Sequence, residues 1–250
     1  MHKAFPWIFF SAMTVAGCRE YVRVPSVCTN DPACVLPTEN GDAKISRDPH
    51  RLQAFKKRNI ESTVVVQTSF YGKDGLQHKT ATGALIGTKG FVLTTHSAVA
   101  NAEFITATYR LVTPEETVTT YRETPLELTL FSRTHNVALL RILKKDQHQA
   151  PFPLRHGPVV KGDDLWWFGV SSGARKMKVS TTDITINLNG RGFMLMNGML
   201  GDSDNGAPIV NDCGEFVGIL LYNDSGGRGV YALPIETIFE ALSLRTTDLY

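Results

Sequence analysis

The sequence predicts an all-β globular domain that ends in one helix. From Ile60 onward it consists of short runs rich in Val, Ile, Thr and aromatic residues, such as EFITATYRLV and FVGILLYN. Gly, Asn, Asp or Pro stands in nearly every gap, which favours an antiparallel sandwich or barrel over strands that alternate with helices. Only the stretch from Pro234 to Leu244 has helical spacing, with its apolar residues on one face.

Each expected strand is a run of apolar and β-branched residues bounded by turn-forming residues. The last of these runs leads directly into the expected helix, so the helix closes the domain. In chain order the expected strands cover residues 62–70, 80–87, 90–96, 103–112, 117–123, 126–132, 136–143, 163–170, 183–188, 192–197, 207–211, 216–223 and 229–235.

The composition is that of a folded domain without a nucleic-acid partner. Of the 250 residues, 42% are hydrophobic and 20% are charged, which is ordinary for a globular protein. The 26 basic and 24 acidic residues give a net charge of +2, far from the clustered excess of a nucleic-acid binder. The cysteines and histidines form no zinc-site pattern, so we expect neither a metal nor another cofactor.

Residues 1–17 are predicted to be a signal peptide. The apolar stretch from Ala4 to Gly17 contains Pro6 and polar residues, and it is shorter than the roughly 20 residues that a membrane-spanning helix needs. Its end, Val-Ala-Gly-Cys, resembles the lipobox of bacterial lipoproteins. The resemblance implies cleavage before Cys18, acyl chains such as palmitate on that cysteine, and a place in the bacterial cell envelope. Arg19 after the cysteine implies the outer membrane or cell surface.

Residues 18–58 are predicted to be a tether that carries the lipid, and residues 59–250 the globular domain. Cys28 and Cys34 lie in a turn-rich segment without a core of its own, where an exported protein is often stapled by a disulfide. The alternative is two free thiols. The basic end of the tether is expected to be a solvated linker or a short surface helix, with attraction to anionic lipid as the other possibility. Cys213 is expected to be a buried, inert thiol.

Three segments, in this order, resemble trypsin-like serine proteases of the HtrA type over residues 60–242. TATGALIGTKGFVLTTHSAV places His96 where the family has its catalytic base, and THNVALLRI places Asn136 where the family has its aspartate. GDSDNGAPIVNDCGEFVGI resembles the nucleophile loop, and KGDDLWWFGV and VYALPIETI resemble two further family strands. The resemblance implies a two-barrel, chymotrypsin-like fold with a C-terminal helix.

The nucleophile loop can be aligned with the family in two registers. Without gaps, Asn205 takes the position of the serine and Ser203 that of a glycine. Alternatively Ser203 is the nucleophile, and two residues are inserted before Pro208. We prefer the gapless register, because an insertion would disturb the tight turn whose N–H groups stabilise the oxyanion. In that register Ser203 also weakens this turn, since a glycine is more permissive there.

These substitutions predict a domain that binds but does not cut. An amide cannot replace the attacking alcohol, and the NH₂ group of Asn136 can select the wrong tautomer of His96. We therefore expect a membrane-anchored pseudoprotease that holds a protein or an extended peptide in the cleft between the barrels or along a strand edge. The alternative is an active serine endopeptidase with Ser203 as nucleophile, His96 as base and Asn136 as orienting residue. The sequence does not distinguish the pseudoprotease from a purely structural envelope protein.

Overall fold

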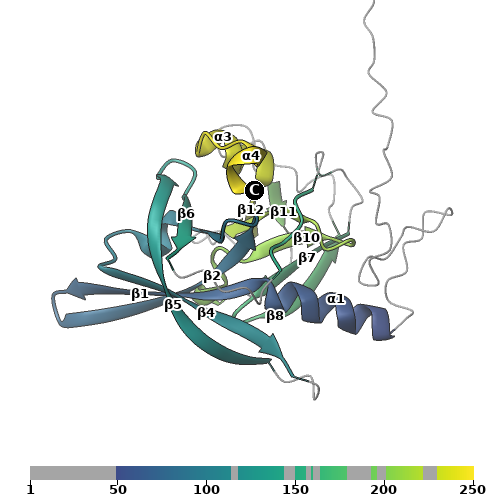
Figure 1. The fold of residues 1–250 in the computed structure, drawn as a ribbon, viewed down its shortest axis with the longest axis horizontal. Coiled ribbons are helices and arrows are strands. Elements are labelled where there is room, and N and C mark those ends of the chain that lie inside the picture. The colour runs from purple at the N-terminus through teal and green to yellow at the C-terminus, as the bar shows by residue number, and fades with distance from the viewer. Residues whose placement is uncertain are drawn as a thin grey trace, which may run out of the picture.

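The computed structural model describes residues 49–113, 118–143, 150–155, 159, 164–178, 193–195, 201–221 and 230–250. Within these ranges the protein is mostly β, as expected, with two antiparallel sheets and short helices at their edges (Figure 1). The candidate lipid site Cys18 and the pair Cys28 and Cys34 lie outside the described residues, as does the strand expected at 183–188. No helix in the described ranges is long and apolar enough to cross a membrane.

The first sheet is a closed six-stranded barrel. Its interior is filled by alternate residues of each strand, for example Val64 and Val66, which are fully buried. This period of two is the pattern that the sequence shows. The strands pair in the order β1-β2-β3-β6-β5-β4 and comprise β1 (Thr63–Gly72), β2 (Gly75–Ile86), β3 (Phe91–Thr94), β4 (Phe104–Val112), β5 (Val118–Ser132) and β6 (Val137–Ile142).

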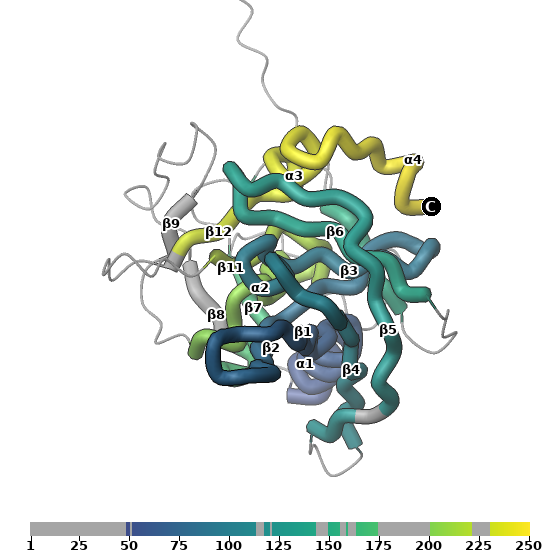
Figure 2. Tube along the Cα trace, turned by 90° about the vertical axis from the view of Figure 1, so that its left-hand side faces the viewer, coloured from purple at the N-terminus to yellow at the C-terminus, as the bar shows by residue number. Residues whose placement is uncertain are grey.

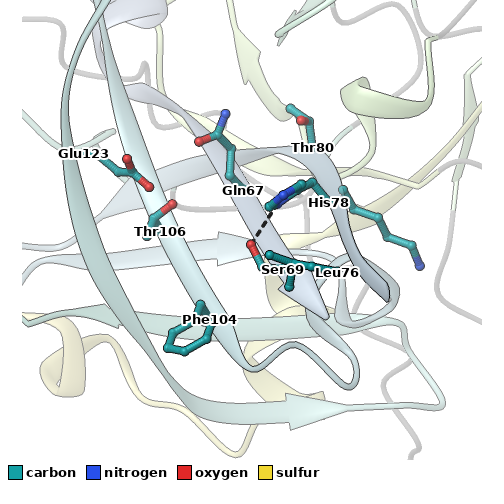
Figure 3. A pocket seen from close by; sticks show the side chains of 9 residues that line it. Gln67, Ser69, Leu76, His78, Thr80, Phe104, Thr106 and Glu123 are labelled. Carbon is teal, nitrogen blue, oxygen red and sulfur yellow. Dashed lines mark hydrogen bonds between the residues drawn. The ribbon is translucent and has the colours of Figure 1, made fainter. Parts of the chain in front are cut away.

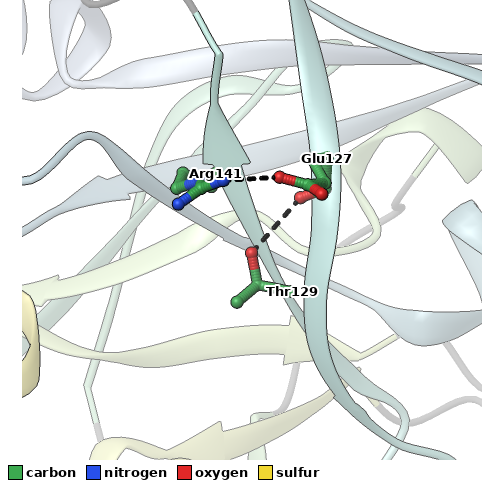
Figure 4. A network of polar contacts seen from close by, with 3 residues as sticks. All are labelled: Glu127, Thr129 and Arg141. Atoms are coloured by element: carbon green, nitrogen blue, oxygen red, sulfur yellow. Dashed lines mark hydrogen bonds and ion pairs between the residues drawn. The ribbon is translucent and has the colours of Figure 1, made fainter.

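Strand β5 joins two runs that the sequence predicts as separate strands. It pairs with β4 as far as Pro125 and with β6 from Leu126 onward. A proline has no N–H to give to a ladder, so Pro125 fits the point where the pairing changes from one neighbour to the other. Beyond it, Glu127 and Arg141 form an exposed cross-strand ion pair at 2.8 Å (Figure 4). Such exposed pairs contribute only about 0.2–1 kcal/mol.

The second sheet has six strands in the order β8-β7-β10-β11-β12-β9. In Figure 2 its strands β7, β11 and β12 lie to the left of the barrel strands β3, β5 and β6. Its β8, with the sequence GARKMK, was not expected, because the segment lacks the β-branched residues by which strands are recognised. The strands are β7 (Asp164–Gly169), β8 (Gly173–Lys178), β9 (Phe193–Leu195), β10 (Pro208–Asn211), β11 (Phe216–Leu221) and β12 (Val230–Pro234).

Helix α1 (Pro49–Glu61) corrects the predicted end of the tether. Its Phe55 is 1% exposed and packs against Trp166 and Phe168 of β7, with ring centroids 5.3 and 5.9 Å apart. These residues belong to a core cluster that also includes barrel side chains. The helix is therefore part of the globular domain, which includes Pro49 and does not begin at residue 59.

The expected C-terminal helix is confirmed. Helix α3 (Ile235–Ala241) follows Pro234, whose extended backbone caps it, and buries Ile238 completely. A last short helix, α4 (Thr246–Leu249), follows it. The carbonyl of Leu249 accepts the backbone N–H groups of Thr88 and Lys89 in the β2–β3 turn, so the end of the chain is attached to the barrel.

Candidate functional site

His96 begins the short helix α2 (His96–Val99), directly after β3. Its ring is half-buried and stacks on Phe131 of β5, with centroids 4.9 Å apart and an interplanar angle of 25°. The guanidinium of Arg133 lies 5.9 Å from the centre of the same phenyl ring. Burial, and then the positive charge of Arg133, lower the pKa of His96 from its ordinary value. Both effects favour the neutral imidazole, the form that can accept a proton.

Asn136 lies in the turn between β5 and β6, beside the histidine. Its carbonyl accepts the N–H of His96 at 3.2 Å, and its side-chain Oδ1 accepts the N–H of Ser97 at 2.8 Å. The structure therefore brings these two predicted residues together through the backbone of α2. The amide oxygen contacts the main chain of Ser97 and not the imidazole ring.

Asn205 follows the 3-10 helix η2 (Asp202–Asp204) and faces the same turn. Its amide Nδ2 lies 3.5 Å from Oγ of Ser97, the residue next to His96. The hydroxyl of Ser203 instead contacts that of Ser171, in the turn after β7. Of the two candidates for the nucleophile position, Asn205 is thus the one whose side chain reaches the α2 turn.

Two backbone N–H groups of the loop, those of Asn205 and Gly206, have partners within the loop and the sheet. Asn205 donates to the carbonyl of Asp202 at 3.4 Å, and Gly206 donates to Leu220 at 2.8 Å. Gly206 has a φ of +87°, and a Cβ there would lie 2.3 Å from the carbonyl oxygen of Thr82. Only glycine fits both this conformation and this contact. An oxyanion at Asn205 would have to compete with the Asp202 carbonyl for its N–H.

Several contacts of the site were not predicted from the sequence. Thr82 of β2 donates its hydroxyl to the Ser203 carbonyl at 2.6 Å and accepts the N–H of Val170 at 3.1 Å. Thr95, just before His96, has a fully buried hydroxyl without a hydrogen-bond partner among the described residues. No local motif marks Thr82, since its partners come from distant parts of the chain.

Away from these residues, the neighbouring strands β2, β1, β4 and β5 form a concave surface. This pocket of about 290 Å³ includes a hydrogen bond of 2.9 Å between Oγ of Ser69 and Nδ1 of His78 (Figure 3). A serine and a histidine in contact suggest nucleophilic catalysis. However, Ser69 lies on β1, which is paired on both sides, so its surroundings offer no spare N–H groups to stabilise an oxyanion. We assign this pair to the sheet surface.

The remaining predicted residue in the described ranges is Cys213. It is 8% exposed and lies between β10 and β11, as expected of a buried thiol. Within these ranges no group of His, Cys, Asp and Glu is arranged to hold a metal ion.

Comparison with known proteins identifies one family. A model of the trypsin-like peptidase domain matches residues 81–219. The HtrA-type protease AlgW with a tripeptide has a similar structure, with a TM-score of 0.56 and 18% identity. A variant of AlgW, also with a tripeptide, gives the same values. In both cases the match covers 75% of this chain and 61% of the other, less than two thirds of its length. No curated protein matches the sequence.

Proposed function

Because the chain belongs to the trypsin-like peptidase family, we propose that it is a member that binds a protein or an extended peptide without cleaving it. One observation carries the proposal: the side chain that reaches the α2 turn from the nucleophile loop is the amide of Asn205, 3.5 Å from Ser97. A carboxamide has no proton that a histidine can remove to create a strong nucleophile.

Two further features support the loss of hydrolysis. The Asn136 oxygen accepts from Ser97, so it does not hold the imidazole in the tautomer that a base needs. The N–H of Asn205 points to Asp202 within the loop, whereas an oxyanion hole needs donors directed at the developing charge. The contact of Ser203 with Ser171 gives the alternative nucleophile no link to His96.

Features that favour binding remain beside these residues. Phe131 is 48% exposed and forms an apolar surface next to His96, with Arg133 at its edge. The similar AlgW structures hold a tripeptide. In the described part of the second sheet, β8 and β9 each have a neighbour on one side only, and an edge strand can accept an extended chain by backbone pairing. We therefore expect Phe131 to contribute to binding, since exposed aromatic residues are frequent anchors at interfaces.

Two experiments test the proposal. A fluorophosphonate probe should fail to label the protein, casein should remain uncut, and Ser203→Ala should change neither result. Peptides selected for binding should lose about tenfold in affinity with Phe131→Ala, measured by fluorescence anisotropy. Phe104→Ala is the matched control, because it removes a phenyl group that is 65% exposed but lies in the pocket on strands β1, β2, β4 and β5. Covalent labelling of Ser203 would establish the active endopeptidase instead.

We further propose that the domain is held at the cell envelope by a lipid on Cys18. The support is the Val-Ala-Gly-Cys sequence at the end of the apolar N-terminal stretch. Cys18→Ala should release the protein from membranes, and mass spectrometry of the native protein should find acyl chains on its N-terminal cysteine. An unmodified N-terminus at another position would contradict the anchor.

In the same segment we propose a disulfide between Cys28 and Cys34. Closing so short a loop stabilises by only about 2 kcal/mol, so the domain should stay folded after reduction. Thiol counting on the exported protein should find Cys213 reduced. A bridge that includes Cys213 would contradict this pairing.

A further inference from the structure

The loop that presents Asn205 is built around a buried carboxylate. Asp204 is 0% exposed. Its Oδ1 accepts the N–H groups of Ser171 at 2.8 Å and Ser172 at 3.1 Å, and its Oδ2 accepts that of Gly201 at 3.2 Å. These bonds attach the start of η2 to the turn between β7 and β8. The carboxylate is therefore the group on which the shape of this loop depends.

The counter-charge to this carboxylate comes from the barrel. Arg110 of β4 is 5% exposed, and its Nη1 donates to the carbonyl of Gly169 at 3.3 Å. A Cβ on Gly169 would lie 2.1 Å from Oδ1 of Asp204, so the guanidinium and the carboxylate both lie next to Gly169. Burial lowers the pKa of Arg110, and the charge of Asp204 acts against this. An arginine stays protonated even so, and a buried charge needs such a partner.

The two charges belong to different sheets. Arg110 lies in the closed barrel, whereas Asp204 precedes β10 of the second sheet. Thr82 crosses the same boundary, because its N–H donates to the Asn205 carbonyl at 3.0 Å. The position of Asn205 relative to α2, which is also attached to the barrel, thus depends on contacts made across the boundary between the sheets.

We propose that Arg110 is a positioning residue: from the barrel it holds the end of β7 at Gly169, beside the turn whose N–H groups bind the Asp204 carboxylate, and so fixes the loop 201–206 that presents Asn205 to the His96–Ser97 turn. The effect of Arg110 on peptide affinity rests on the proposed function. Its effect on the loop does not, and is measured without any peptide.

Hydrogen exchange followed by mass spectrometry separates this role from a general effect on stability. Arg110→Met should speed exchange of the amides at 171, 172 and 201 at least tenfold more than that of amides in β1 and β6. Arg110→Lys keeps the charge and should restore part of the protection. Arg141→Met, at an exposed arginine of β6, is the control and should leave the loop unchanged. Equal acceleration in loop and barrel, or none, would overturn the proposal.

A second measurement decides the case if Arg110→Met does not fold. Asp204→Asn alone removes a negative charge near the buried arginine, whereas Asp204→Asn with Arg110→Met removes both charges. We expect the double variant to be more stable in urea than Asp204→Asn alone, because neutralising both members costs less than isolating one. If adding Arg110→Met further destabilises Asp204→Asn by its full single-variant effect, or unfolds it, the two residues are independent and the proposal fails.

Discussion

The side-chain oxygen of Asn136 accepts the backbone N–H of Ser97 at 2.8 Å, one residue beyond His96. Asn136 itself has a φ of +50°, a conformation that asparagine tolerates better than most residues. The oxygen can accept a second hydrogen bond, but the NH₂ group of the same amide can also turn toward the imidazole, as no carboxylate could. A donor at Nδ1 keeps the ring proton on Nε2, the nitrogen that a general base must have unprotonated.

The titration of His96 is the first prediction. Its pKa should lie below the ordinary value of 6.5, because burial and the charge of Arg133 both disfavour the imidazolium. Arg133→Gln should raise this pKa, and NMR of the ring protons measures both values. An unchanged pKa in Arg133→Gln would contradict the assigned influence of Arg133.

The same shift makes stability depend on pH. Between the lowered pKa and 6.5 the unfolded chain binds more protons at this residue than the folded protein. The contribution of His96 to the free energy of unfolding therefore increases as the pH rises through that window and is lost as the pH falls through it. Urea unfolding of the protein and of His96→Gln should show a smaller pH dependence in the variant.

Gly206→Ala should destabilise the domain by more than about 2 kcal/mol, because a left-handed conformation and a backbone clash act together. Its φ is +87°, and the new Cβ would lie 2.3 Å from the Thr82 carbonyl oxygen. Gly173→Ala is the matched control, since its φ is +66° but nothing lies within 4 Å of its Cβ. Equal losses in thermal unfolding would mean that the clash is relieved by movement.

Removing the Phe55 side chain tests whether α1 belongs to the domain. Phe55→Ala should cost about 3–5 kcal/mol, as is usual for a buried phenyl group, because its ring packs on Trp166 and Phe168. Lys57→Ala, on the exposed side of the helix, should change stability by less than about 0.5 kcal/mol. If both variants lost a similar amount of stability, α1 would belong to the tether and not to the globular domain.

The difference between expectation and structure at α1 has a physical cause. Its sequence, PHRLQAFKKRNIE, is polar on most of its surface, so periodicity does not distinguish it from a linker. The packing of α1 onto the domain depends on Phe55 and on its contact with Trp166, which is more than 100 positions away in the sequence. The barrel strands, in contrast, carry their own signal, because alternate residues such as Val64 and Val66 are buried.

The residues of the site could also be predicted only where a local sequence segment marks them. His96 and Asn136 could be predicted because each lies in a contiguous segment of the sequence. His96 comes shortly after β3, and Asn136 comes just before β6. The contribution of Arg110 was not predictable, since its contact with Gly169 joins two sheets. The choice between Asn205 and Ser203 also depends on which side chain the loop directs to α2. The gapless register stays a prediction, which chemical labelling tests.

Restoring the family's residues should restore some hydrolysis. The variant combines Asn205→Ser, which supplies an alcohol beside Ser97, with Asn136→Asp, whose two oxygens can accept from both the Ser97 N–H and the imidazole. We expect the aspartate to matter greatly, because an asparagine in that role typically costs about 10⁴ in turnover. Labelling by a fluorophosphonate and cleavage of casein are the measurements, with His96→Ala in the same background as the control.

Ser203→Gly is needed as a third change. The N–H of Asn205 donates to Asp202, so the loop must rearrange before its donors can face an oxyanion, and a glycine at 203 permits the required backbone conformations. Since one such donor is worth about 10² to 10³ in turnover, the triple variant should exceed the double variant by that factor. Equal rates would mean that the loop already presents its donors, whereas no labelling in either variant would place the defect outside these three positions.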